Sequence, residues 1–378
     1  MKIKKIVFLT GTRADFSKLK SLIRISQNSN NYEVHIFATG MHMNAKYGKT
    51  IDEIYKAGFK KVYPFINHDT IEHMDRTLSK TIDGFSHFIS ELNPDLIIVH
   101  GDRVEALSGA IVGSLNNILV AHIEGGEVSG TIDELIRHSV SKLSHIHLVA
   151  NEDAKKRLIQ LGEYQNSIHI LGSPDLDLMN PKQLPKYEDV CEYYDVKFQD
   201  YSIAVFHPIT TDYKQVYFCI KEFVDALIGS ELNYIVIYPN NDLGSNEILN
   251  EYKKIEDNKR FKIFPSLRFE YFLTLLKNSE FIIGNSSSGI REAPFYNIPT
   301  IDIGTRQKNR ANSPSIFHSG YEKIKILKEI QNIKNYKNTS KEVQHYYGNG
   351  KSDVLFLELL NSDKFWKISC QKQFQDLK

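Results

Sequence analysis

The first half of the chain contains three short segments in which carboxylates, basic side chains and glycines stand close together. The first, residues 11–19 (GTRADFSKL), is a turn between an apolar run and a helical pattern. Its amides and the Arg13 guanidinium could hold a phosphate, because the first turn of a helix presents free N–H groups and a positive dipole. Capping of the helix by Asp15 or Ser17 explains these residues equally well. Neither G-x-G-x-x-G nor the Walker pattern is present, so a dinucleotide fingerprint or P-loop is not supported.

The second segment, residues 100–106 (HGDRVEA), follows a buried apolar run. Adjacent side chains at the end of a strand point in different directions, so Asp102 and Arg103 can serve different parts of one ligand. Asp102 is a candidate base and Arg103 a candidate anion clamp. Gly101 leaves the backbone open to close approach, which favours this interpretation over a structural ion pair with a neighbouring helix.

The third segment, residues 122–138 (HIEGGEVSGTIDELIRH), joins a glycine-rich acidic loop to the start of a helix. Thr131 and Glu134 have the spacing of a capping box, which is the favoured interpretation of that pair. Asp133 and Arg137 are one helical turn apart and share a face. A helix that begins beside a Gly-Gly loop places its first turn at any site that the loop forms.

The second half of the chain carries a serine-rich segment, residues 284–292 (GNSSSGIRE), between a predicted strand and a predicted helix. Hydroxyls and free amides at such a position can converge on a phosphate. Glu292, about one and a half turns into the helix, could accept both hydroxyls of a ribose. His207 and Asn240 follow two earlier predicted strands. His207 could donate to a phosphate or be a neutral histidine at the edge of the core, and its position leaves both open.

A metal centre is not expected. His122-x-Glu124 resembles part of the deaminase zinc motif, but no P-C-x-x-C follows it. His145 and His147 lie on a predicted strand, where a structural role is commoner than metal binding. The three cysteines are scattered and predict neither a disulfide framework nor a zinc site. With no apolar run near the roughly 18 residues that span a bilayer, a soluble cytoplasmic protein is the expectation.

The net charge of the chain excludes some ligand classes, and its length predicts the number of domains. The 378 residues carry a formal net charge of +1, so no global positive field exists to hold a nucleic acid or an anionic membrane. Any polyanion must be bound locally. At roughly 150 residues per domain, two domains are favoured.

Short apolar runs alternate with helical patterns along most of the chain, which is typical of βα units on a parallel sheet. The predicted strands are residues 6–9, 33–37, 95–99, 118–123, 146–149 and 168–171, and then 202–206, 234–238, 262–264, 281–283 and 300–303. A polar stretch, residues 180–201, separates the two series. We therefore predict an α/β protein with two Rossmann-like domains, 1–175 and 176–378, that face a central cleft. Residues 351–378 are predicted to form an amphipathic helix that packs back on the first domain.

Several segments together resemble the hydrolysing UDP-N-acetylglucosamine 2-epimerases of sialic acid synthesis. In chain order, to about residue 310, they are GTRADFSKLK, HGDR-x-EALSGA, HIEGGEVSGTIDE-x-IRH, His-Pro at 207, GNSSSGIREAP and IDIGTRQ-x-NR. The resemblance implies a GT-B-like fold that binds a UDP-sugar, and conversion of UDP-N-acetylglucosamine to free N-acetylmannosamine and UDP. It also implies no metal or NAD cofactor, and a homodimer or a dimer of dimers.

The resemblance further implies roles for individual residues. It implies that the catalytic carboxylates are Asp102, Glu124 and Asp133. Three residues are implied to lie near the diphosphate or the sugar: Arg13, Ser17 and Arg103. Two more are implied to lie on the helix that faces the sugar: Arg137 and His138. The UDP site corresponds to His207, Asn240, Ser286, Ser287, Glu292 and Arg306.

Four other functions fit parts of this pattern. The same chemistry could act on a UDP-2,4-diacetamido-trideoxyhexose of the legionaminic acid route. The sequence of the loop from Glu124 to Thr131, however, is more similar to that of the N-acetylglucosamine enzymes. A non-hydrolysing epimerase would return UDP to the inverted sugar. A GT-B glycosyltransferase shares the architecture. A nucleotide-sugar sensor would bind without reaction, and the density of carboxylates around Glu124 argues against it.

Overall fold

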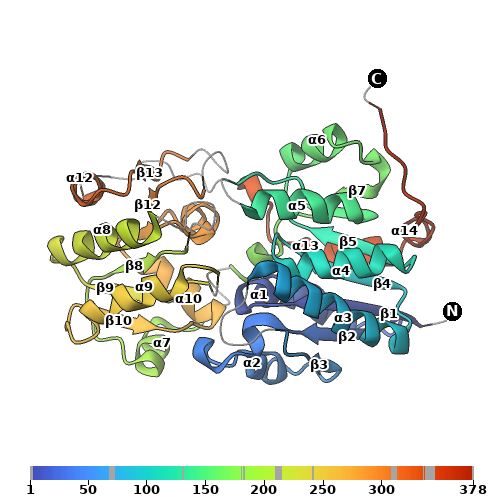
Figure 1. The fold of residues 1–378 in the computed structure, drawn as a ribbon, viewed down its shortest axis with the longest axis horizontal. Coiled ribbons are helices and arrows are strands. Elements are labelled where there is room, and N and C mark those ends of the chain that lie inside the picture. Colours follow the sequence, from blue (N-terminus) through green and yellow to red (C-terminus); the bar gives the residue numbers. More distant parts are fainter. Residues whose placement is uncertain are drawn as a thin grey trace. The chain divides into compact units, whose positions relative to one another are not determined.

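The computed structural model describes residues 3–67, 73–129, 132–179, 181, 184–208, 215–240, 242–307, 313–334, 336 and 345–376. The chain divides into two compact units (Figure 1). Unit 1 comprises Met1–Glu127, Asp133–Asn180 and Tyr346–Lys378, and unit 2 comprises Val128–Ile132 and Pro181–His345. The boundary predicted after residue 175 lies inside a short 3-10 helix of unit 1, η4 (Pro174–Leu178). Within the described ranges, no helix is long and apolar enough to cross a membrane.

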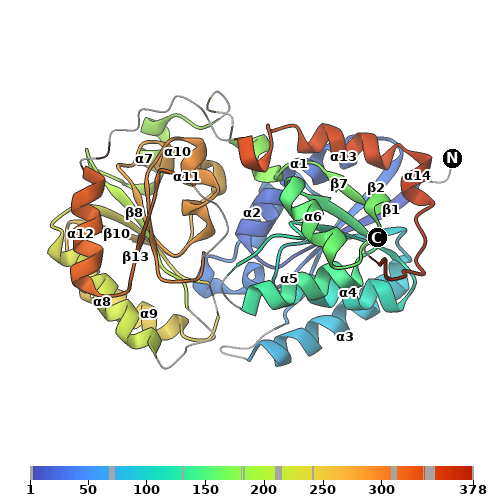
Figure 2. The same cartoon turned by 90° about the horizontal axis from the view of Figure 1, so that it is seen from above.

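Unit 1 is built on a parallel sheet of seven strands in the order β3-β2-β1-β4-β5-β6-β7. The strands are β1 (Lys4–Thr10), β2 (Tyr32–Ala38), β3 (Val62–Pro64), β4 (Leu96–His100), β5 (Leu119–Ile123), β6 (Ile146–Val149) and β7 (Ile168–Ile170). The helices are α1 (Arg13–Gln27), α2 (Ile51–Lys56), α3 (Met74–Leu92), α4 (Val104–Leu115), α5 (Ile132–Leu143) and α6 (Glu152–Gln160), with α13 (Ser352–Leu360) and α14 (Asp363–Trp366) in the C-terminal segment. Helices α1 and α13 cover one face of the sheet, and α3 and α4 cover the other (Figure 2). This explains why central strands such as β4 are apolar at nearly every position.

Unit 2 is built on a parallel sheet of six strands in the order β10-β9-β8-β11-β12-β13. The strands are β8 (Ser202–Val205), β9 (Tyr234–Ile237), β10 (Phe261–Phe264), β11 (Ile282–Gly284), β12 (Thr300–Ile303) and β13 (Ile316–Ser319). The helices are α7 (Tyr187–Tyr194), α8 (Val216–Gly229), α9 (Ser245–Tyr252), α10 (Phe269–Lys277), α11 (Glu292–Phe295) and α12 (Lys323–Lys334).

The order of strands reverses once in each sheet, between β1 and β4 in unit 1 and between β8 and β11 in unit 2. Loops at the carboxyl ends of strands beside such a switch point are where open α/β sheets bind ligands. These loops contain Gly11–Thr12 and Gly101–Asp102 in unit 1, and His207 and Asn285 in unit 2. The prediction of two Rossmann-like sheets is therefore confirmed, and the motifs lie where that fold can use them.

The C-terminal segment differs from the single helix predicted for residues 351–378. It forms α13 (Ser352–Leu360) and α14 (Asp363–Trp366), and residues 367–376 are not helical. Asn361 and Ser362 separate the two helices, because short polar side chains of this kind favour caps and turns over helix interiors. As predicted, the segment packs on the first sheet: Phe356, Leu360 and Phe365 belong to the apolar core of unit 1.

Replacement of Phe356 by Ala is expected to lower the free energy of unfolding of unit 1 by about 3–5 kcal/mol, because this side chain is fully buried in the core. Leu355→Ala, one residue earlier on α13 and 37% exposed, is the control and should cost about 1 kcal/mol or less. Trp366 is the only tryptophan and lies in unit 1, so its fluorescence during urea unfolding reports on this unit. Equal losses in the two variants would contradict a core role for the C-terminal segment.

Candidate active site

The turn between β1 and α1 is closed by a capping box. Thr12 is the N-cap, and its hydroxyl accepts from Asp15 N at 3.2 Å. The Asp15 carboxylate in turn accepts from the backbone N–H groups of Gly11 and Thr12, at 2.9 and 3.0 Å. Capping by Asp15 is thus confirmed, and it occupies two of the amides considered for phosphate. Ser17 does not cap the helix, since its hydroxyl donates to the carbonyl of Arg13 at 2.8 Å.

Arg13 remains a candidate for anion binding. Its Nη2 lies 3.3 Å from Glu53 Oε1, and its side chain is 16% exposed. A guanidinium has five N–H donors in a planar fork, so one carboxylate neighbour does not use up its capacity for a second anion.

Asp102 and Arg103, at the end of β4, have different partners. Asp102 forms an ion pair with Arg137 of α5, whose side chain is fully buried. Arg137 Nη1 also donates to the carbonyl of Glu127 at 3.4 Å. Arg103 Nε instead donates to Glu105 Oε2 at 3.3 Å. The ion pair with a neighbouring helix, considered the less favoured explanation, is therefore present for Asp102, and a quarter of its side chain is still exposed.

Glu124, directly after β5, has an unusual backbone conformation. Its φ of +70° lies in the left-handed region, which costs a residue other than glycine about 1 kcal/mol or more. Its carboxylate is nevertheless buried, with Oε1 3.0 Å from Lys18 Nζ and Oε2 3.5 Å from His100 Nε2. Oε2 also lies near Gly101, where a Cβ would be 3.6 Å away. Glu124 is therefore next to the residue that precedes Asp102, and both acidic residues follow adjacent strands of unit 1, β4 and β5.

Three residues around Glu124 were not among the predicted site residues: Lys18, His100 and Asp175. Lys18 Nζ is also 3.8 Å from Asp175 Oδ2, so one buried ammonium stands between two buried carboxylates. Lys18 could have been found from the sequence, because it is one helical turn before Leu22 on the apolar face of α1. Asp175 could not, since it comes from a distant segment.

Helix α5 begins with predicted site residues. Asp133 and Glu134 stand in its first turn, and Glu134 Oε1 lies 3.7 Å from His138 Nε2, as expected for residues one turn apart. Burial lowers the pKa of His138. Thr131, the other half of the predicted capping box, lies outside the described residues.

In unit 2, Asn285 joins the loops that follow β8, β11 and β12. Its side-chain amide accepts from His207 N at 2.7 Å and donates to His207 O at 2.9 Å. The backbone carbonyl of Asn285 accepts hydrogen bonds from Arg306 Nη1 and Gln307 Nε2, at 3.2 and 2.9 Å. Asn285 is fully buried. It was not among the predicted site residues, because its structural role depends on hydrogen bonds to His207, which is 78 positions away in the sequence.

The ring of His207 is oriented by Asn240, whose backbone N–H donates to His207 Nδ1 at 3.0 Å. Nδ1 is therefore the acceptor, and the hydrogen of the neutral ring is on Nε2. The two interpretations of His207, a donor to phosphate and a neutral histidine at the edge of the core, are therefore compatible, because even the neutral ring offers an N–H donor.

The remaining predicted residues of unit 2 lie on the same edge of the sheet. Ser286 is the N-cap of a 3-10 helix, η7 (Ser287–Gly289), and its Oγ accepts from Ser288 N at 3.3 Å. Glu292 is 2% exposed at the start of α11. Among the described residues of the chain, no group of three or more His, Cys, Asp and Glu side chains is arranged to hold a metal ion.

Comparisons with known proteins agree with this architecture. A family model described as UDP-N-acetylglucosamine 2-epimerase matches residues 24–361. A Neisseria meningitidis protein of that name is 47% identical over 99% of this chain and 100% of its own. A Legionella pneumophila protein named UDP-N,N'-diacetylbacillosamine 2-epimerase (hydrolyzing) is 32% identical over 95% and 96%. The structure of a Methanocaldococcus jannaschii UDP-GlcNAc 2-epimerase in complex with UDP-GlcNAc and UDP matches the fold with a TM-score of 0.82 at 24% identity, over 94% and 99%.

Replacement of Gly126 by Ala is expected to lower the free energy of unfolding of unit 1 by about 3 kcal/mol, from strain and overpacking together. The φ of Gly126 is +74°, and a Cβ there would be 2.2 Å from the carbonyl oxygen of Ala154. Gly58→Ala is the control, since φ is +87° but nothing lies within 4 Å of the new Cβ, and it should cost only about 1 kcal/mol. Urea unfolding followed by Trp366 fluorescence measures both, and a similar cost in the two would show that backbone contact does not restrict the acidic loop.

Proposed function

The chain belongs to the UDP-N-acetylglucosamine 2-epimerase family, and we propose that it is a hydrolysing member that converts UDP-N-acetylglucosamine and water to free N-acetylmannosamine and UDP. The observation that carries the proposal is that carboxylates follow two adjacent strands of unit 1, Asp102 after β4 and Glu124 after β5, each beside its own buried cation. A relative whose name includes hydrolyzing, 32% identical over nearly all of both chains, supports the hydrolytic outcome.

The chemistry requires that the C2 hydrogen of the sugar be made acidic first. This hydrogen is not next to a carbonyl, so a carboxylate with a pKa of about 4 cannot remove it from the ground state. If the anomeric C–O bond breaks toward UDP first, its electron pair leaves with the diphosphate and the electron-poor C1 acidifies C2. Loss of the C2 proton to a carboxylate then forms the C1=C2 bond of 2-acetamidoglucal.

We assign stabilisation of the departing UDP to cations and donors aimed at its growing negative charge. In unit 2 these are the Nε2–H of His207 and the hydroxyls of Ser286 and Ser287, with Arg306 nearby and Glu292 for the ribose. In unit 1 they are Arg13 and Arg103.

We assign proton transfer at C2 to Asp102, Glu124 and Asp133. The ion pair with Arg137 holds the Asp102 carboxylate in one position, and a quarter of this side chain stays exposed, so it can reach a substrate and accept a proton. Water then adds its hydroxyl to C1, and a proton reaches C2 from the opposite face, which inverts that carbon. The proposed reaction uses no metal ion and no nicotinamide.

A second candidate substrate is a UDP-2,4-diacetamido-trideoxyhexose. The Legionella pneumophila relative carries the corresponding sugar in its name. The chemistry at C1 and C2 would be the same, so only a direct comparison of the two UDP-sugars decides between them.

Incubation of the purified protein with UDP-N-acetylglucosamine in heavy water, with a chelator and no acceptor, is expected to yield UDP and free N-acetylmannosamine with deuterium at C2. Mass spectrometry and NMR measure the products, and the diacetamido substrate is tested in parallel. Labelled UDP-N-acetylmannosamine would instead identify a non-hydrolysing epimerase. Unlabelled starting material alone, with neither substrate consumed, would contradict epimerase activity altogether.

Asp102→Asn should lower kcat by at least about a hundredfold, because an amide cannot accept the C2 proton. UDP should still bind with its wild-type Kd, measured by calorimetry, since the nucleotide is assigned mainly to unit 2. Asp83→Asn, at a side chain that is 80% exposed, is the matched control and should keep wild-type kcat. Wild-type turnover in Asp102→Asn would remove this residue from the catalytic group.

A further inference from the structure

The last residues of the chain contact the end of α5 that is opposite to Asp133. We propose that Lys372 is a positioning residue for the reaction, which holds the C-terminal turn of α5 and thereby keeps Arg137 in place beside Asp102. This inference rests on the proposed function, because α5 matters for catalysis only if Asp102, Asp133 and Arg137 take part in it.

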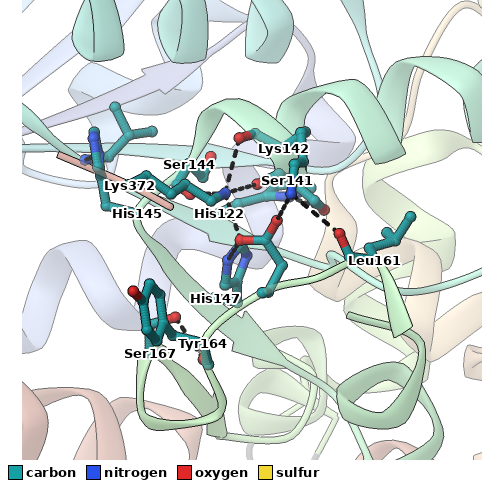
Figure 3. Close-up of polar contacts among 12 residues, drawn as sticks. His122, Ser141, Lys142, Ser144, His145, His147, Leu161, Tyr164, Ser167 and Lys372 are labelled. Carbon is teal, nitrogen blue, oxygen red and sulfur yellow. Dashed lines mark hydrogen bonds and ion pairs between the residues drawn. The ribbon is translucent and has the colours of Figure 1, made fainter. Parts of the chain in front are cut away.

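The Lys372 ammonium acts as a cap for α5. Its Nζ donates to the carbonyls of Ser141, Lys142 and Ser144, at 3.0, 2.8 and 2.6 Å (Figure 3). The last carbonyls of a helix lack partners within the helix and carry negative partial charge, so a cation here satisfies them and suits the dipole. A side chain 231 positions away in sequence from Ser141 thus completes the end of this helix.

A buried carboxylate fixes the position of the ammonium. Lys372 forms an ion pair with Glu163, which also lies 3.0 Å from Lys142 Nζ and 2.9 Å from His147 Nε2. Figure 3 shows Lys372, Lys142 and His147 turned toward one another. Burial works against the Glu163 charge, but the hydrogen bond from His147 and the Lys372 ammonium lower the pKa of Glu163 overall. The carboxylate is therefore ionised at neutral pH and holds both lysines.

The same turn of α5 is connected to the Asp102 loop. Burial lowers the pKa of His122 to about 3, so its ring is neutral. His122 Nε2 contacts the carbonyl of Gly101 at 2.8 Å and must donate to it, which leaves Nδ1 to accept from Ser141 Oγ at 3.0 Å. One end of α5 is thus tied to Gly101 through Ser141 and His122, and Arg137, further along the helix, is tied to Asp102.

Other contacts hold the tail in position around Lys372. His145 Nδ1 accepts from Val120 N at 3.0 Å, so Nε2 carries the hydrogen and donates to the carbonyl of Cys370 at 3.1 Å. Gln375 N donates to the carbonyl of Gly162 at 3.0 Å. Lys142 Nζ is 4.7 Å from the centre of the Phe374 ring. The tail therefore follows a defined path, and Lys372 is not a loosely held surface lysine.

Lys372→Met tests the proposal. The variant keeps the apolar stem and leaves Glu163 with Lys142 and His147, so the fold is expected to persist. We expect kcat to fall by about tenfold to a hundredfold, because a small displacement of catalytic groups costs rates of this order. The Kd for UDP should stay at the wild-type value, and amide hydrogen exchange should become faster in α5. Lys367→Met, at an exposed lysine of the same tail, is the control and should leave all three unchanged.

The outcomes separate positioning from plain stability. A lower thermal midpoint with wild-type kcat and wild-type exchange in α5 would overturn the proposal. If Lys372→Met does not accumulate as folded protein, Lys372→Gln, which keeps a neutral donor, is judged by the same two measurements. Should the wild-type enzyme turn over neither UDP-sugar, the proposed function fails, whereas exchange in α5 still tests whether Lys372 holds the helix.

Discussion

The fully buried guanidinium of Arg137 needs a carboxylate beside it, and this requirement connects α5, the helix that follows the acidic loop, to the end of β4. Removal of one partner from a buried ion pair leaves an uncompensated charge, which costs about 3–5 kcal/mol. The pairing therefore restricts where α5 can lie in unit 1. The Lys18–Glu124 pair applies the same restriction to α1 and the end of β5. Charge pairing in the interior thus fixes the loops after β4 and β5 against α5 and α1, which the hydrogen bonds of the sheet alone leave unspecified.

Much of the fold could be predicted because its signals are local. Largely apolar runs of three to six residues identified eleven of the strands, and glycines and small polar residues after them identified the loops. The strands that were not predicted, β3 and β13, lie at sheet edges; β3 contains a proline, which speaks against a strand, and β13 has only two adjacent apolar residues. The break between α13 and α14 was missed for a related reason, since apolar periodicity continues across Asn361 and Ser362.

The site was less predictable, because its organisation depends on pairs of residues far apart in sequence. The segments with Asp102, Glu124 and His207 were found from residue types that follow a strand. Their partners were not: Asp175 reaches Lys18 from 157 positions later, and Asn285 reaches His207 across 78. A single sequence contains no signal for such pairings unless, as for Lys18, a charged residue interrupts an apolar helix face.

The left-handed backbone of Glu124 has a consequence for attempts to stabilise this enzyme. Glycine would adopt that conformation without strain, but it would also remove one of the two carboxylates beside the buried Lys18 ammonium, and the loss of a buried ion-pair partner costs more than the strain. A choice of substitutions by backbone conformation alone would favour glycine here, and the resulting chain would be less stable. Attempts to rigidify this loop are therefore better directed at exposed positions whose side chains hold no buried charge.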